Sequence, residues 1–183
     1  MGWRASDTRQ LFFNDMKIAP GTMLGKITDG LKMFLKTLTS GRISIGALAV
    51  GTALGAYEKA LKYATEREAF GKSIYKFQSI GFKLADMATE IEAAKLMVYH
   101  AAWLKDHGED FTKQAAMAKL FASEVAMKST IEAIQVFGGY GYVKENDVER
   151  FFRDAKILEI GEGTSEIQRI IIVREILKNF QIL

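Results

Sequence analysis

A single carboxylate between two glycines is the group in this chain best suited to acid–base chemistry. Glu162 lies in the run Glu159-Ile-Gly-Glu-Gly-Thr-Ser-Glu-Ile-Gln-Arg169, with Gly161 and Gly163 on either side. Glycines allow the backbone to approach a ligand closely and leave the carboxylate unshielded by neighbouring side chains. Such a group can take one proton from a substrate bound in a cleft. The alternative interpretation is a solvated loop acid in front of an ordinary helix.

A helix is expected to begin directly after this carboxylate. Ser165 and Gln168 have the spacing of a capping box, in which a hydroxyl and an amide satisfy free N–H groups at the helix start. The predicted helix covers residues 165–178.

Three further stretches carry side chains that could bind a charged ligand. Arg42 begins a helix rich in small residues, and Arg67 and Gln78 enclose a loop that contains Phe70. The run Gln135-Val-Phe-Gly-Gly139 ends an apolar helix. Taken alone, these features indicate a surface arginine, helix capping and a turn.

The elements that must position these residues are predicted to be helices from about residue 27 onward. The clearest one carries apolar residues at alternating steps of four and three, which is typical of a helical bundle: Ile80, Leu84, Met87, Ile91, Ala94, Val98 and Ala101. The helix at residues 43–67 has a face of small residues that favours close packing: Gly46, Ala47, Gly51 and Gly55.

Two more helices are predicted, at residues 112–136 and 147–156. The first has an expected core of five residues: Met117, Leu120, Val125, Ile131 and Ile134. Short connections between long helices favour antiparallel neighbours. The predicted fold class is therefore all-α, an up-and-down antiparallel helical bundle.

The beginning of the chain follows a different pattern. Residues 11–19 mix aromatic and apolar residues and end at the turn signal Pro20-Gly21, which predicts one strand after a loop at residues 1–8. A lone strand is not a stable sheet, so its partner would have to come from elsewhere. We expect a short N-terminal β remnant in front of the bundle.

Composition excludes several classes of protein. The chain has 183 residues and no cysteine, and its two histidines, His100 and His107, have no third ligand nearby, so no metal site is expected. The net charge of +3 is spread along the chain and does not indicate a nucleic-acid partner. The longest uncharged run, residues 43–57, is shorter than the roughly 20 residues that a membrane span needs. Neither a dinucleotide fingerprint nor a serine-hydrolase motif is present.

Taken together, the motifs resemble those of the acyl-CoA dehydrogenases. The Glu162 run follows Thr39-Ser-Gly-Arg42, Arg67-Glu-Ala-Phe-Gly-Lys72 with Gln78, and Gln135–Gly139, in the order found in that family. The resemblance covers essentially the whole chain but only about the C-terminal half of a typical member. It implies that residues 1–26 are a remnant of the middle β-domain with its linker, and that residues 27–183 are the C-terminal helical bundle domain.

The activity implied by this resemblance is FAD-dependent α,β-dehydrogenation of an acyl-CoA thioester. Glu162 would be the catalytic base, with Arg42 and Gly163 beside the substrate. Some relatives carry the base at the position of Gly41, so a glycine there indicates the short-chain, butyryl-CoA type. The residues implied to contact FAD are Arg67, Phe70, Gln78, Gln135, Val136, Phe137, Gly138, Gly139, Thr164, Ser165 and Glu166.

The resemblance also implies a setting for the protein. Family members are typically tetramers that pass electrons to an electron-transfer flavoprotein, in the bacterial cytoplasm or the mitochondrial matrix. Because the N-terminal helices and most of the β-domain are missing, the chain alone is expected to fold but to be inactive and to bind FAD weakly. The alternatives are a helical interaction module without an active site, and a related flavoenzyme such as an acyl-CoA oxidase.

Overall fold

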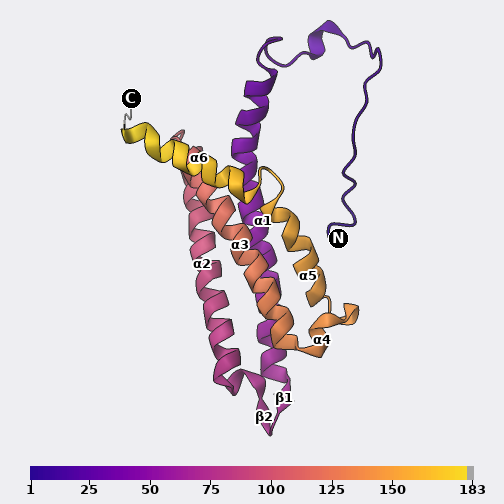
Figure 1. The fold of residues 1–183 in the computed structure, drawn as a ribbon, viewed down its shortest axis with the longest axis vertical. Coiled ribbons are helices and arrows are strands. Elements are labelled where there is room, and N and C mark those ends of the chain that lie inside the picture. Colours follow the sequence, from indigo (N-terminus) through magenta and orange to yellow (C-terminus); the bar gives the residue numbers. More distant parts are fainter. Residues whose placement is uncertain (181–183) are drawn as a thin grey trace.

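Three long helices form the centre of the computed structural model, which describes residues 1–180 (Figure 1). They are α1 (Gly30–Glu66), α2 (Gln78–Asp106) and α3 (Thr112–Phe137). Three shorter helices follow: α4 (Gly139–Tyr142), α5 (Val148–Ala155) and α6 (Ser165–Leu177). Five short 3-10 turns complete the helical elements: Pro20–Thr22, Ile74–Lys76, Lys144–Asn146, Lys156–Glu159 and Lys178–Phe180.

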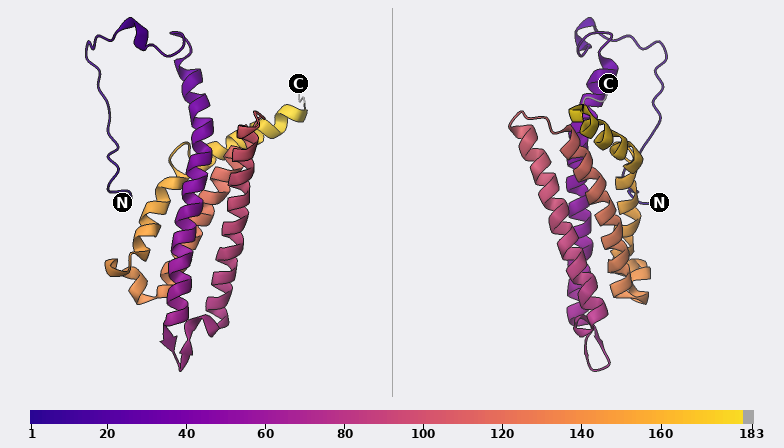
Figure 2. Two further views of the ribbon diagram at one scale, coloured as in Figure 1. Left: turned by 180° about the vertical axis from the view of Figure 1, so that it is seen from behind. Right: turned by 60° about the vertical axis from the view of Figure 1, so that its left-hand side comes forward.

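The long helices run up and down as neighbours, which confirms the predicted all-α bundle (Figures 1 and 2). A small hairpin, β1 (Glu68–Ala69) and β2 (Lys72–Ser73), joins α1 to α2 and was not predicted. Its tip is Phe70 and Gly71, both left-handed with φ of 52° and 78°. Along residues 1–180, none of the helices has the length and apolar character needed to cross a bilayer.

Alanine dominates the surfaces where the long helices meet. The stripe predicted on α2 is confirmed, since every member is buried except Ile80, which packs partly buried against the core. The residues that α1 and α3 turn toward it are mostly alanines: Ala49, Ala53, Ala56, Ala60, Ala64, Ala115, Ala118, Ala122, Ala126 and Ala133. Small side chains let helices approach closely, so little volume separates the three backbones.

Two details of the predicted packing are wrong. Of the small residues on α1, Gly46 is buried, whereas Ala47 and Gly51 are exposed. On α3, Val125 is buried but Ile131 is exposed, because the alanine face is the one that α3 turns toward its neighbours. A Cβ at Gly46 would lie 3.0 Å from Val98 Cγ2 on α2, which identifies a point of close helix approach.

The N-terminal segment arches away from the beginning of α1 and returns toward α5, and it contains no strand, so the prediction for residues 11–19 is wrong (Figure 2). A strand is stable only when its backbone pairs with another, and no segment within residues 1–180 pairs with this one. The first residues contact α5 instead. The Trp3 N–H donates to Asp154 Oδ1 at 2.6 Å, and Arg153 Nη1 donates to the Met1 carbonyl at 3.2 Å.

Candidate active site

The loop that carries Glu162 has a left-handed backbone. It connects the turn Lys156–Glu159 to α6, and the φ angles are 55° at Glu162 and 93° at Gly163. A non-glycine residue with positive φ is strained and persists only where its surroundings hold it. The Glu162 side chain is therefore presented by a conformation that the rest of the fold must maintain.

The capping of α6 differs from the predicted capping box. Thr164, not Ser165, is the N-cap, and its hydroxyl accepts a hydrogen bond from the Ile167 N–H at 3.4 Å. Glu166 follows in the first turn, where hydrogen bonds from its own backbone N–H and from the Thr164 hydroxyl lower the pKa of its carboxyl. The N-cap therefore lies one residue earlier than predicted, and the Gln168 side chain bonds to other partners.

Gln168 and Lys119 both bind the backbone of the Glu162 loop. The buried Gln168 Nε2 donates to the Gly163 carbonyl at 2.8 Å and to the Glu162 carbonyl at 3.3 Å. Lys119 Nζ, from α3, donates to the same Gly163 carbonyl at 2.8 Å. Two donors from two helices thus converge on one oxygen.

The other wall of this site is α1. A Cβ on Gly41 would lie 2.6 Å from Glu162 Oε2, so the carboxylate rests directly against a helix position without a side chain. Arg42 is only 6% exposed, and its Nη1 donates to Thr39 Oγ1 at 3.4 Å. Burial and the charge of Arg174 lower the pKa of Arg42, and the carboxylate of Glu162 opposes that shift. The site thus contains a half-buried carboxylate and a buried guanidinium that interact electrostatically.

Replacing Gly163 is expected to destabilise the domain. In Gly163→Ala the backbone of a residue with a side chain would have to keep a φ near 93°. The new Cβ would also lie 2.9 Å from Gln168 Nε2. We expect a loss of about 1–3 kcal/mol in the free energy of unfolding, measured by urea denaturation with circular dichroism. Gly21→Ala is the matched control, because its Cβ would meet nothing within 4 Å. Equal stability of the two variants would contradict the strain assigned to position 163.

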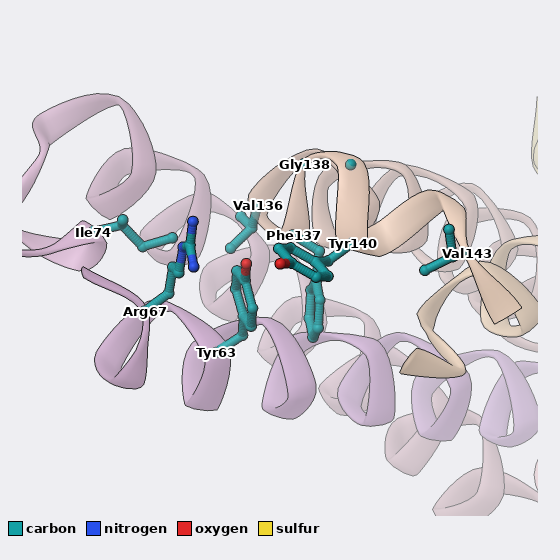
Figure 3. A pocket seen from close by; sticks show the side chains of 9 residues that line it. Tyr63, Arg67, Ile74, Val136, Phe137, Gly138, Tyr140 and Val143 are labelled. Carbon is teal, nitrogen blue, oxygen red and sulfur yellow. The ribbon is translucent and has the colours of Figure 1, made fainter. Parts of the chain in front are cut away.

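A second candidate region lies at the opposite end of the bundle, where α1, α3 and α4 meet (Figure 3). It is a cavity of about 570 Å³ with an aromatic wall, in which Tyr63 and Phe137 stack with ring centroids 4.1 Å apart. The Arg67 guanidinium lies 5.7 Å from the centre of the Tyr140 ring. The residues that line the cavity are Tyr63, Arg67, Ile74, Val136, Phe137, Gly138, Gly139, Tyr140 and Val143.

This cavity contains some of the residues expected to contact FAD, but not all of them. Arg67 and the run 136–139 line it. Phe70 is 95% exposed at the tip of the hairpin, and Gln78 and Gln135 are also exposed outside it. The three expected residues that follow the base, 164–166, lie with Glu162 at the start of α6. The structure therefore places most of the expected FAD residues in two separate groups and leaves Phe70, Gln78 and Gln135 outside both.

Sequence reasoning missed several residues of these sites. Tyr63 lies one helical turn before Arg67, so the spacing could have placed both on one face. Lys119 was not identified from the sequence, although it stands at helical spacing from Ala115 and Ala122 on the buried face of α3. A lysine in register with an alanine stripe is a signal for a buried ammonium.

Comparison with known proteins decides the family. The family model described as "Acyl-CoA dehydrogenase, C-terminal domain" matches residues 28–177. The chain belongs to this family. The helical bundle and the Glu162 loop described above are thus those of an acyl-CoA dehydrogenase C-terminal domain.

The relatives of this domain are longer proteins. The probable acyl-CoA dehydrogenase YngJ of Bacillus subtilis is 57% identical over 178 residues, a match that covers 97% of this chain and 47% of the relative. The mitochondrial short-chain specific acyl-CoA dehydrogenase of Bos taurus is 49% identical, with 99% and 44% covered. The structure of butyryl-CoA dehydrogenase from Megasphaera elsdenii superimposes with a TM-score of 0.89 at 49% identity, with 90% and 43% covered. The chain spans just under half the length of these relatives.

Proposed function

We propose that the chain is the C-terminal domain of a short-chain acyl-CoA dehydrogenase that uses FAD, with Glu162 as the catalytic base. Residues 27–183 would form the helical domain, and residues 1–26 would come from the preceding β-domain. The observation that carries the proposal is the contact between the Glu162 carboxylate and Gly41 beside the buried Arg42. A carboxylate held in that position lies against a helix residue without a side chain, and it acts electrostatically on the buried guanidinium of Arg42.

The residues of this chain would divide the work between proton transfer and binding. Glu162 takes the α-proton of the acyl thioester as the C–H electrons form the new double bond. The Glu162 N–H donates to the thioester oxygen as negative charge develops there. FAD, when bound, supplies the acceptor for the β-hydrogen and its electron pair. Arg42 places a positive charge beside the reacting carboxylate, and exclusion of water by the acyl chain would strengthen these interactions.

The fit of the chain to FAD rests on the cavity between α1, α3 and α4. Aromatic faces such as Tyr63 and Tyr140 suit a flat base, and the Arg67 fork suits a pyrophosphate. Gly138 and Gly139 add no side chain there, since a Cβ at either would meet nothing within 4 Å, so a large ligand has room to approach the backbone. The second group of FAD residues, 164–166, would face the flavin beside Glu162. Because the two groups lie at opposite ends of the bundle, we propose that they serve different FAD molecules in an oligomer.

The test joins the chain to the N-terminal half of the Bacillus subtilis relative, hereafter the joined enzyme. We expect it to purify with bound FAD and to reduce an artificial electron-accepting dye when given butyryl-CoA. Crotonyl-CoA, which already carries the double bond, is the control and should give no reduction. Residues 1–183 alone should do neither, because the rest of both pockets is absent. A folded, FAD-loaded joined enzyme that leaves butyryl-CoA unchanged would refute the activity, and stoichiometric FAD on the chain alone would refute the need for an N-terminal half.

A further inference from the structure

A fully buried lysine lies beneath the Glu162 loop. Lys119 on α3 is 0% exposed, and its Nζ donates to the Gly163 carbonyl at 2.8 Å. Burial of an ammonium is costly, and here it lowers the pKa of Lys119 to about 8. An apolar side chain of similar length would usually serve packing at least as well. The cost of the charge at this position therefore calls for a reason other than stability.

The hydrogen bond of this lysine is directed at the strained part of the loop. Glu162 and Gly163 are both left-handed, and the oxygen that Lys119 binds belongs to the peptide unit that follows them. Gln168, from α6, holds the same oxygen at 2.8 Å. Because the two donors come from different helices, they fix the orientation of this peptide unit in two directions.

Charged groups from each surrounding element act on Lys119. Arg42 on α1 disfavours its ammonium form, whereas Glu159, Glu162 and Glu166 favour it. The Glu162 carboxylate is thus one of three acidic groups around Lys119 that favour its ammonium form. The hydrogen bond of Lys119 goes to the backbone of the Glu162 loop rather than to the carboxylate of the proposed base.

We infer that Lys119 is a positioning residue for the proposed reaction. By holding the Gly163 carbonyl, it sets the backbone of Glu162 so that the carboxylate and the N–H of that residue meet the α-carbon and the thioester oxygen in one geometry. In this role Lys119 acts through the loop backbone, which its ammonium binds, and not through contact with substrate or FAD. This inference rests on the proposed function of Glu162. It adds that a residue of α3 orients the backbone that carries the base.

The test measures proton transfer separately from hydride transfer. Acetyl-CoA has α-hydrogens but no β-carbon, so exchange of its α-hydrogens for deuterium in D₂O reports the base alone. In the FAD-loaded joined enzyme, Lys119→Met is expected to lower this exchange and the kcat for butyryl-CoA about tenfold, since a small misplacement of a reacting group has a large effect on rate. KM and the FAD content should not change. Lys128→Met is the control, because Lys128 lies on the same helix and its ammonium pairs with Glu90.

Further variants keep the inference falsifiable. Gln168→Met removes the other donor to the same oxygen, and the double variant should lose more than the product of the two single effects. If Lys119→Met does not fold, Gln168→Met tests whether loss of a hydrogen bond to the Gly163 carbonyl lowers the exchange. Exchange within twofold of the unmodified enzyme in a folded, FAD-loaded Lys119→Met variant would overturn the inference, provided that Glu162→Gln abolishes exchange. Full exchange in Glu162→Gln would instead refute the proposed function, and with it this role of Lys119.

Discussion

Glu162→Gln in the joined enzyme is expected to reduce kcat for butyryl-CoA by about 10²–10⁴-fold, the range that a general base supplies. The amide has the shape of the carboxylate but cannot accept the α-proton. The backbone contribution should survive, because the N–H of residue 162 and the hydrogen bonds of Gly163 do not involve the side chain that changes. KM and FAD content are therefore expected to stay near those of the unmodified enzyme. The measurement is the rate of flavin bleaching after rapid mixing with butyryl-CoA.

A matched control separates loss of the base from loss of any carboxylate. Glu145→Gln makes the same chemical change at an exposed position in the turn Lys144–Asn146, away from the Glu162 loop. It should leave the rate of flavin bleaching unchanged. Undiminished bleaching in Glu162→Gln would show that the proton goes to another group, whatever the fold of the domain.

The bundle could be predicted from sequence because its helices are long and their apolar residues are periodic. The stripe on α2 repeats apolar residues, five of them large, at steps of four and three, so its buried face was correctly identified. On α1 and α3 the buried face consists mostly of alanines, while large apolar residues such as Leu54 and Ile131 are exposed. A large apolar side chain does not identify the buried face of these two helices, and Ala47 and Ile131 were assigned to packed positions although they are exposed.

The Glu162 loop could be located from its glycines, but the residues that support it could not. Gly163 signals a left-handed backbone in the sequence itself, and the structure has φ of 93° there. Lys119 lies 44 positions away in the chain, and only the packing of α3 against α6 brings its ammonium to the loop. The strand expected at residues 11–19 is a second case in which a distant segment decides the local structure. Its composition favours a strand, but pairing depends on a partner segment that the sequence of the strand does not specify.

The contact between Gly41 and Glu162 predicts that a side chain at position 41 lowers kcat strongly. In Gly41→Val, the Cβ would lie 2.6 Å from Glu162 Oε2 and 3.0 Å from Glu162 Cδ, so the carboxylate must move away from α1. A displacement of about 1 Å can cost 10²-fold in rate, and we expect kcat to fall by about that factor. Gly51→Val is the matched control on the same helix, because a Cβ at Gly51 would meet nothing within 4 Å. The measurement is dye reduction with butyryl-CoA in joined enzymes of equal FAD content.

The same contact predicts that the base can be supplied from α1. In Glu162→Gly with Gly41→Glu, a carboxylate on α1 would enter the volume that the Glu162 side chain vacates. We expect this double variant to recover part of the activity that Glu162→Gly alone loses, because the proton acceptor returns to the same place on a rigid helix. The backbone N–H at position 162 would still be available to the thioester oxygen. Full activity of Gly41→Val, or no recovery in a folded, FAD-loaded double variant, would mean that the carboxylate acts from a position other than the one against Gly41.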